Sequence, residues 1–314
     1  MSKCLLGALL LGHLLSFSLK LEAQQGKTPG HGFVGSWRLR KAERIDGATP
    51  VAISNSQGLI VFDSAGHTVE IITQLGRKPF ASNRPTAEEA LEAFNMFSGF
   101  WGSFRADEKT KIITYHPQGA VNPSLMGQDL KRGYELDGDR LVITSEPGES
   151  NIQGVMRWTW QRVPPIENLD AEYRKVIGFW EWVSDRVVNP ATGDILTEAH
   201  RAPTIIVYAP TGYIGVHFVP SNRKPLAGPM ATAEEAKADI AGYIGYMAVL
   251  TLHPGWVVHH VLFSLVPFGS LDRMYEMVGN ELHLTFPPIT VQGQQRQTLV
   301  TMRRLSGERE MMGE

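Results

Sequence analysis

The stretch GLIVFDSAGHTVEIIT, residues 58–73, decides the fold of this chain. Its first five residues are an apolar run, DSAG at 63–66 supplies a glycine-containing turn, and residues 68–73 return as a second apolar run. Short apolar runs joined by such turns predict the two strands of a β-hairpin. The stretch TIIVYAPTGYIGVHFV, residues 204–219, has the same layout and predicts a second hairpin.

The two hairpins belong to a longer series of repeats. Five pairs of segments recur in the same order at offsets of 141 to 146 residues: GSW 35–37 with GFW 178–180, RKP 77–79 with RKP 223–225, TAEEA 86–90 with TAEEA 232–236, YH 115–116 with HH 259–260, and YE 134–135 with YE 275–276. Ordered self-similarity over such a length indicates a tandem duplication. The copies span residues 33–165 and 174–305, and the proline-containing segment 163–168 links them.

Each copy is also expected to contain one short helix. Thr86 with Glu89, and Thr232 with Glu235, have the spacing of a capping box, in which each side chain bonds to the other residue's backbone N–H. Apolar residues at helical spacing extend the expected helices: Ala90, Phe94, Phe97 and Trp101 in the first copy, and Ala236, Ile240, Tyr243 and Met247 in the second.

Strands resume after each helix. They are expected at residues 111–116, 132–136, 140–144 and 155–162, and again at 257–263, 273–277, 281–286 and 297–305. Many short strands with one short helix per copy predict an all-β fold class with two tandem antiparallel β-barrels. An eight-stranded barrel has room for one small ligand, whereas a tighter barrel is filled by its own side chains. The sequence leaves both open.

Composition agrees with a globular, β-rich protein. Of 314 residues, 43% are hydrophobic and 20% are charged, and there are 31 glycines and 19 prolines. This balance excludes a disordered chain, and the many turn formers favour strands over helices. The formal net charge is −2, with 30 basic against 32 acidic residues. No basic surplus therefore points to nucleic acid as a partner.

The N-terminus has the features of a secretory signal peptide at residues 1–23. Lys3 precedes an apolar run over residues 5–19, and LEA at 21–23 supplies a cleavage site. The run is shorter than the ~20 residues of a spanning helix, so we expect no stable membrane span; a retained anchor is the alternative. We therefore expect the protein in the secretory pathway or secreted. The single cysteine, Cys4, lies in this segment, which excludes thiol catalysis in the mature chain.

Several segments resemble the lipocalin-like domain family. They are the Gly-x-Trp openings, the LIVFD strand at 59–63 with its AGH turn, the RKPF segment at 77–80 and the YH pair at 115–116. The resemblance spans both copies and is closer in the first. It implies that a tryptophan packs at the closed end of each barrel under an arginine of the last strand. The residues at these positions are Trp37 with Arg162, and Trp180 with Arg303 or Arg304.

The two-domain layout with a signal peptide also resembles fungal pericyclases of secondary metabolism. The similar proteins catalyse a hetero-Diels–Alder reaction between a tropolone-type quinone methide and a cyclic terpene. The resemblance implies a cofactor-independent hetero-Diels–Alderase of meroterpenoid biosynthesis, with hydrophobic small molecules as partners. Such a reaction requires two partners held in a near-attack pose and a few hydrogen-bond donors.

Familiar catalytic motifs are absent from the sequence. GHGFVG at 30–35 matches the dinucleotide-binding pattern but lacks the preceding strand and following helix that the pattern requires. No P-loop, Gly-x-Ser-x-Gly or His-Glu-x-x-His occurs. His259 and His260 are neighbours on a predicted strand and point to opposite faces, so they do not share an ion. We therefore expect no metal site and no cofactor.

The candidate catalytic residues are His116 and His260, which occupy matching positions in the two copies. If they face the barrel interior, each imidazole can donate a hydrogen bond or move a proton in an apolar cavity. The alternative is a histidine bonded to a neighbouring strand or turn. Tyr115 and His259 lie on the opposite face and take over this role if the interior face is theirs.

Aromatic residues are the candidates for contact with substrate. They gather in both copies: Phe97, Phe100, Trp101, Phe104, Trp158 and Trp160, and then Tyr243, Tyr246, Trp256, Phe263 and Phe268. We expect seven residues to bind substrate: Tyr115, Trp101, Phe104, Trp158, Tyr246, Trp256 and His259. Barrel core is the alternative interpretation for many of these aromatic residues.

Three functions fit these features. One is the pericyclase, the second is a secreted non-catalytic carrier of a hydrophobic small molecule, and the third is a structural protein with filled barrels. The same pocket would serve the first two, inside one barrel or between the two. The sequence does not specify the oligomeric state.

Overall fold

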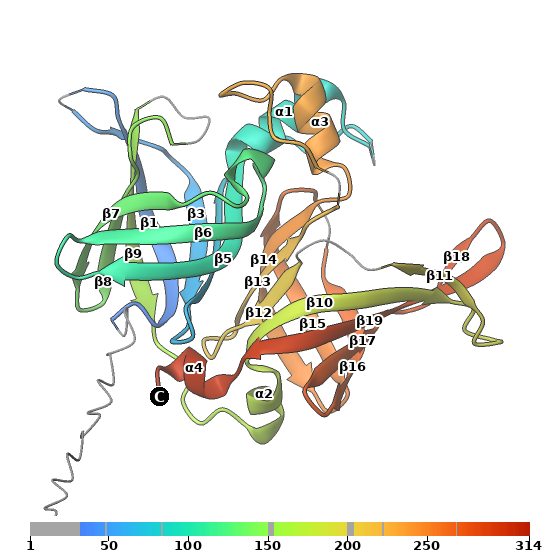
Figure 1. Cartoon of the computed structure of the whole chain (residues 1–314). Coiled ribbons are helices and arrows are strands. Elements are labelled where there is room, and N and C mark those ends of the chain that lie inside the picture. The colour runs from blue at the N-terminus through green and yellow to red at the C-terminus, as the bar shows by residue number, and fades with distance from the viewer. Residues whose placement is uncertain are drawn as a thin grey trace, which may run out of the picture.

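The computed structural model describes residues 32–47, 49–82, 84–149, 154–199, 204–221, 223–267 and 269–314. Two β-barrels lie side by side, and the segment 164–177 connects them (Figure 1). The expected signal peptide at 1–23 and Phe268 lie outside the described residues. The expected all-β fold class with two closed antiparallel barrels is confirmed.

Barrel 1 is formed by the first copy. Its strands are β1 (Gly35–Ile45), β2 (Val51–Ala52), β3 (Ser56–Phe62), β4 (His67–Gln74), β5 (Phe97–Asp107), β6 (Ile112–Ala120), β7 (Leu130–Asp137), β8 (Arg140–Thr144) and β9 (Val155–Val163). Neighbouring strands pair antiparallel in the order β2-β1-β3-β4-β5-β6-β7-β8-β9. β1 also pairs with β9, which closes eight of these strands into a barrel.

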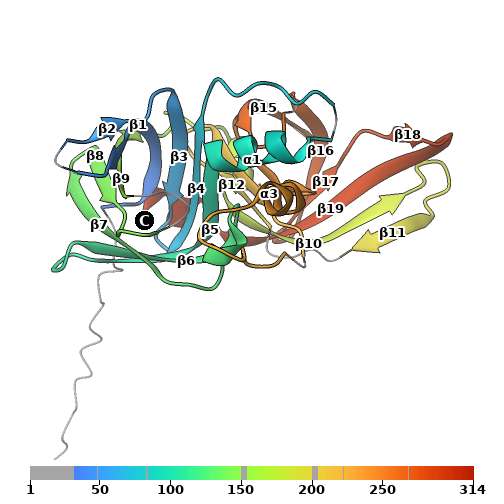
Figure 2. The ribbon, with the colours of Figure 1, turned by 90° about the horizontal axis from the view of Figure 1, so that it is seen from above.

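Barrel 2 repeats this arrangement with the second copy. Its strands are β10 (Gly178–Val188), β11 (Ile195–Ala199), β12 (Ile205–Tyr208), β13 (Tyr213–Phe218), β14 (Ile244–His253), β15 (Trp256–Ser264), β16 (Leu271–Val278), β17 (Glu281–Thr285), β18 (Ile289–Val291) and β19 (Gln294–Ser306). β10 pairs with β19 and closes the barrel. β11 and β18 extend the far ends of β10 and β19, away from barrel 1 (Figure 2).

The stretch quoted first forms the hairpin β3–β4, with Val61 opposite Val69. Residues 59–63 are all buried. Ile60 and Phe62 belong to the interior of barrel 1, whereas Leu59 and Val61 pack in the core shared with barrel 2. Both faces of β3 are therefore covered, and this explains why the strand is a continuous apolar run instead of an alternating one.

The two expected helices form, but they are shorter than the apolar stripes suggest. α1 (Ala87–Met96) and α3 (Ala233–Ile240) begin at the predicted capping boxes. The extension of α1 to Trp101 is wrong, because β5 begins at Phe97; Met247 likewise lies in β14. Gly99 gives a physical reason: an added Cβ there would lie 2.5 Å from the carbonyl oxygen of Glu70, so β5 runs close against β4.

Three further short helical segments occur beyond the one helix expected in each copy. η1 (Pro123–Leu125) is a 3₁₀ turn after β6, α2 (Ala171–Val176) lies in the connection between the barrels, and α4 (Glu308–Met312) follows β19. Asp170 caps α2 by accepting a hydrogen bond from the backbone N–H of Tyr173 at 2.7 Å. α2 leads directly into the closed end of barrel 2.

A tryptophan under an arginine closes one end of each barrel, as expected from the family resemblance. The guanidinium of Arg162 lies 4.1 Å from the ring of Trp37, and that of Arg304 lies 4.1 Å from the ring of Trp180. Each arginine also donates to backbone carbonyls, for example Arg162 Nη1 to Val34 at 2.6 Å. Of the two arginines considered for barrel 2, Arg304 is therefore the stacking residue.

The two barrels share a hydrophobic core. Its members include β3, β4, β5 and α1 residues of barrel 1 together with most of the buried residues of barrel 2. α1 and α3 pack against each other above this contact (Figure 2). One polar group crosses it: His217 of β13 donates through Nε2 to the backbone carbonyl of Glu70 in β4 at 3.0 Å. The barrels are thus packed as one body.

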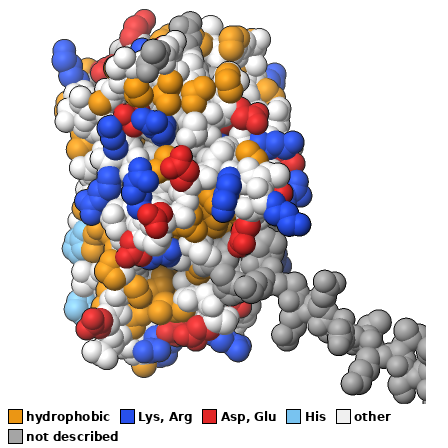
Figure 3. All heavy atoms as spheres, turned by 90° about the vertical axis from the view of Figure 1, so that its left-hand side faces the viewer, with side chains coloured by type: hydrophobic (Ala, Val, Ile, Leu, Met, Phe, Trp, Pro, Cys, Tyr) orange, Lys and Arg blue, Asp and Glu red, His pale blue; other side chains and the backbone are white. Residues whose placement is uncertain are grey.

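The outer face of barrel 1 mixes both signs of charge. Figure 3 shows lysine and arginine side chains next to aspartate and glutamate, with hydrophobic side chains between them. This pattern agrees with the formal net charge of −2. A surface without a one-sign field gives no electrostatic reason to attract a polyanion on this face.

Candidate functional site

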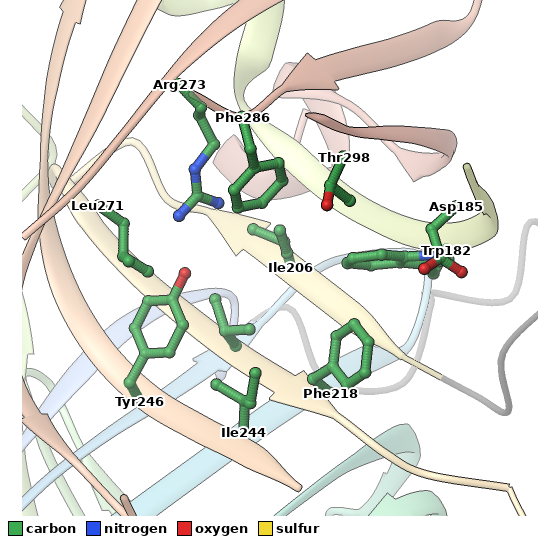
Figure 4. A pocket seen from close by; sticks show the side chains of 11 residues that line it. Trp182, Asp185, Ile206, Phe218, Ile244, Tyr246, Leu271, Arg273, Phe286 and Thr298 are labelled. Carbon is green, nitrogen blue, oxygen red and sulfur yellow. The ribbon is translucent and has the colours of Figure 1, made fainter. Parts of the chain in front are cut away.

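The lumen of barrel 2 contains a cavity of about 280 Å³ near the end opposite Trp180. Side chains from β10, β12, β13, β14, β16 and β19, and one from the segment after β17, line it: Trp182, Asp185, Ile206, Val216, Phe218, Ile244, Tyr246, Leu271, Arg273, Phe286 and Thr298 (Figure 4). Most of these side chains are apolar. Ligand pockets in proteins usually have volumes of about 300–1,000 Å³, so this cavity suits one small molecule.

Smaller side chains on the last strand explain why barrel 2 has this space. Counted back from the stacking arginine, the positions two and four residues earlier are Trp160 and Trp158 in β9. The same positions in β19 are Met302 and Val300. Both tryptophans are buried inside barrel 1, so the exchange removes two indole rings from the lumen of barrel 2. Close-packed interiors leave open volume where large side chains are lost without replacement.

A chain of three side chains forms a polar wall of the cavity. The Tyr208 hydroxyl lies 3.0 Å from Nε2 of His259, and the Tyr246 hydroxyl lies 2.7 Å from Nδ1 of the same ring. Burial, with the nearby charges of Arg273 and His260, lowers the pKa of His259 well below its usual range. The imidazole is therefore neutral, and it donates to one tyrosine and accepts from the other.

Burial also raises the pKa of Tyr208 and of Tyr246, although Arg273 opposes this effect on both. Both phenols therefore keep their protons. His259 lies behind the cavity wall, and only Tyr246 of these three lines the cavity itself. The chain of hydrogen bonds thus fixes the orientation of one hydroxyl at the edge of an apolar space, where it can bond to a ligand oxygen.

Arg273 is the cationic group of the cavity. Its side chain is 2% exposed, and the guanidinium lies 4.7 Å from the ring of Phe286. Figure 4 shows the guanidinium and the Tyr246 hydroxyl pointing toward the same part of the cavity, with Asp185 and Trp182 on the opposite side. A cation and a hydroxyl donor in an otherwise apolar lumen can orient a ligand that carries an oxygen acceptor.

The prediction that His116 and His260 face a barrel interior is wrong. Both are exposed, and they bond to outer neighbours: His116 Nδ1 lies 3.0 Å from Asp129 Oδ1, and His260 Nε2 lies 2.9 Å from Thr251 Oγ1. This is the alternative of a histidine bonded to an adjacent strand or turn. Because side chains alternate along a strand, the interior positions belong to Tyr115 and His259, which are 0% exposed.

The expected substrate-binding residues are not brought together in one site. Phe104, Tyr115 and Trp158 belong to the interior of barrel 1, whereas Trp101 packs in the core shared by the barrels. Trp256 begins β15 and is 36% exposed, so it does not reach the cavity of barrel 2. Tyr246 alone among the seven lines that cavity, with His259 directly behind it.

Sequence reasoning missed most of the residues that line the cavity. Arg273, Trp182 and Phe218 were not considered as site residues, although a signal for Arg273 existed. Arg132 and Arg273 precede the repeated Tyr-Glu pair by two residues, at the same offset as that pair. An arginine that recurs on a barrel strand at an inward position is a candidate for interior chemistry, since buried charges are rare without a partner.

Two searches of the described residues found no additional feature of interest. Within the described ranges, no group of three or more His, Cys, Asp or Glu side chains could hold a metal ion. None of the helices described is long and apolar enough to cross a membrane.

Comparison with known proteins gives one family match and several distant structures. Residues 34–163, which form barrel 1, match the family model described as lipocalin-like domain. No curated protein matches the sequence. The chain is similar to the crystal structure of the uncharacterized protein YLR301w from Saccharomyces cerevisiae, with 12% identity, a TM-score of 0.44, and coverage of 88% of this chain and 99% of that chain.

A second similar structure is transferrin binding protein B from Haemophilus parasuis, with 6% identity, a TM-score of 0.23, and coverage of 88% of this chain and 77% of that chain. TM-scores this low do not establish a common topology.

Proposed function

From a lipocalin-like barrel 1 and a second barrel of the same strand order, we propose that this protein binds a small hydrophobic molecule in the lumen of barrel 2. The observation that carries the proposal is the cavity of about 280 Å³ with its largely apolar lining. An apolar ligand that enters it leaves water, which contributes about 25 cal/mol for each Å² of apolar surface buried. We also propose, from residues 1–23, that binding takes place in the secretory pathway or outside the cell.

The experiment is a titration of the purified protein with the neutral fluorophore 1-aminoanthracene. We expect saturable binding with about one site per chain, because one cavity of this size holds about one small ring system. Ile206→Phe places a ring inside the cavity, and we expect it to weaken binding by about tenfold or more, since one methylene of misfit already has an effect of this size. Leu262→Phe adds the same ring at a position that is 47% exposed, and it is the matched control.

Failure of the proposal has a clear form in this titration. Absence of saturable binding would exclude an accessible hydrophobic site. Equal affinity of the native protein and of Ile206→Phe would place the fluorophore elsewhere on the molecule. A selective loss in Ile206→Phe, with the Leu262→Phe control unchanged, supports the lumen of barrel 2.

A second candidate function is the cofactor-independent hetero-Diels–Alder reaction implied by the resemblance to fungal pericyclases. The observation that favours it is the Tyr246 hydroxyl, oriented by His259 at the edge of the cavity. The reaction forms two σ bonds between a heterodiene and an alkene and releases nothing, so it requires orientation and one donor to the heterodiene oxygen. With His116 and His260 on the outside, a donor role would fall to Tyr246, supported by His259.

The size of the cavity bears on this choice. A volume of about 280 Å³ suits one small ligand better than two partners in contact, so we place carriage before catalysis. Incubation of the protein with extracts of the producing organism separates the two functions. New adducts by mass spectrometry, absent with heat-killed protein and reduced by Tyr246→Phe, would support catalysis. A ligand that remains bound through purification, without new adducts, would support carriage.

A further inference from the structure

We infer that the ligand of barrel 2 carries a carboxylate, and that Arg273 is the group that binds it. The inference rests on the proposed function, because it names the chemical class of the molecule that enters the cavity. The ligand is then an apolar molecule with one acidic end, such as a fatty or terpenoid acid.

The first observation is the state of the Arg273 guanidinium. Its side chain is 98% buried and lines the cavity. Among the described residues, Nε and Nη2 have no hydrogen-bond partner. These two nitrogens lie on one edge of the guanidinium, which matches the two oxygens of a carboxylate. A buried cation with this edge unused is costly unless an anion binds there.

Barrel 1 shows what the same position requires. Arg132 is the counterpart of Arg273, since Arg132 lies opposite Ile113 and Arg273 lies opposite Val257 in equivalent strand pairs. In barrel 1 the edge formed by Nε and Nη2 binds one carboxylate oxygen of Glu149, at 2.9 and 2.7 Å. Nη1 binds Oε2 of Glu70 at 2.9 Å. The chain itself thus supplies two carboxylates to the interior arginine of barrel 1.

The second copy has lost both acidic partners. Glu70 lies opposite Ile60 and Phe100, and the residue between the equivalent strands, opposite Ile206 and Tyr246, is Val216. Glu149 lies in the connection between β8 and β9. The corresponding segment in the second copy, residues 286–293 (FPPITVQG), contains no acidic residue. The arginine has been kept while its internal counter-ions are gone, so the missing anion is expected from outside.

The other ionisable groups that line the cavity leave this site to the ligand. Asp185 stands on the opposite side of the cavity (Figure 4), and no ion pair joins it to Arg273 among the described residues. Tyr246 keeps its proton, because burial raises its pKa. Its hydroxyl is therefore a neutral neighbour that can bond to the same carboxylate.

The test compares decanoate with its neutral amide, decanamide, by isothermal titration calorimetry of the native protein at pH 8. We expect decanoate to bind about ten- to a hundredfold more tightly, the range for hydrogen bonds to a buried charge. Arg273→Met should remove this preference and leave decanamide binding within about threefold of native.

A second variant keeps the arginine and restores the carboxylate of barrel 1. Val216→Glu places a carboxylate at the position equivalent to Glu70, so we expect it to abolish the preference for decanoate. Val216→Gln is the matched control, with nearly the same shape and no charge, and we expect it to keep the preference. This pair decides the question even if Arg273→Met fails to fold.

The outcomes separate this inference from the proposed function. Equal binding of decanoate and decanamide to the native protein would overturn the carboxylate site and leave hydrophobic binding intact. Binding of 1-aminoanthracene without binding of either probe would also overturn the carboxylate site. Absence of binding by all three molecules would overturn the proposed function, and the inference with it. Loss of the preference in Val216→Gln as well would show that shape, not charge, decides.

Discussion

Replacing His217 with glutamine tests how the two barrels are held together. His217 is 0% exposed and lies in the contact between β13 and β4. Its Nε2 lies 3.0 Å from the backbone carbonyl of Glu70, which can only accept, so Nε2 carries the hydrogen. Nδ1 then accepts from the Tyr243 hydroxyl. The ring is thus a neutral imidazole with both nitrogens in use.

Burial makes this histidine a sensor of pH for the stability of the whole protein. It lowers the pKa of His217 from about 6.5 to about 4, although the hydrogen bond to Glu70 opposes this. The unfolded chain takes up a proton below about pH 6.5, whereas the folded chain does not until about pH 4. The stabilisation is therefore fully present above pH 6.5 and is lost as the pH falls toward 4. Between pH 7.5 and pH 4.5 the loss amounts to about 2.5 kcal/mol.

The assay is denaturant unfolding of the native protein and of His217→Gln between pH 7.5 and pH 4.5. At neutral pH the native protein should be the more stable, and the difference should shrink by about 2.5 kcal/mol on acidification. His260→Gln, on an exposed face, is the control for loss of a histidine and should follow the native curve. A difference between native and His217→Gln that stays constant over this range would refute the reasoning, because the histidine would then not be buried and neutral.

Three further variants have defined expectations. Glu70→Gln removes one of two carboxylates from the buried guanidinium of Arg132 and should lower the free energy of unfolding by about 3 kcal/mol; an unchanged denaturation midpoint would contradict a buried ion pair. Tyr246→Phe deletes the hydroxyl bonded to His259, so thermal unfolding should report a loss of about 1–2 kcal/mol. Arg304→Met removes the cation above the tryptophan at the closed end of barrel 2, and we expect a loss of about 1–3 kcal/mol in urea unfolding, with no change pointing to a solvent-exposed pair.

Local patterns carried most of the information about architecture. The hairpins at residues 58–73 and 204–219, the two capping boxes and the closed-end tryptophans depend on short-range spacing, which the fold preserves. The helix ends were misplaced because Phe97 and Trp101 continue an apolar stripe at helical spacing, while the close approach of β5 to β4 at Gly99 depends on a strand 28 residues earlier. Long-range contacts of this kind leave no mark in local periodicity.

The site was harder to predict, because alternation along a strand gives two faces without saying which one is inside. His116 and Tyr115 are neighbours, and so are His260 and His259; only the closure of each barrel assigns Tyr115 and His259 to the interior. Where β3 is covered on both faces, even the alternation disappears. The polar chain around His259 also joins residues of three strands, which a linear pattern does not connect.

The sequence by itself determined that this protein is a duplicated β-barrel, because duplication, turn chemistry and apolar runs are written in neighbouring residues. Only the tertiary structure decided that barrel 2 has an open lumen and that Arg273 has no carboxylate beside it. The physical reason is that space and charge balance are set by groups brought together across the barrel: the rings of Trp158 and Trp160 are missing from one lumen, and the partner of an arginine is defined by distance in space.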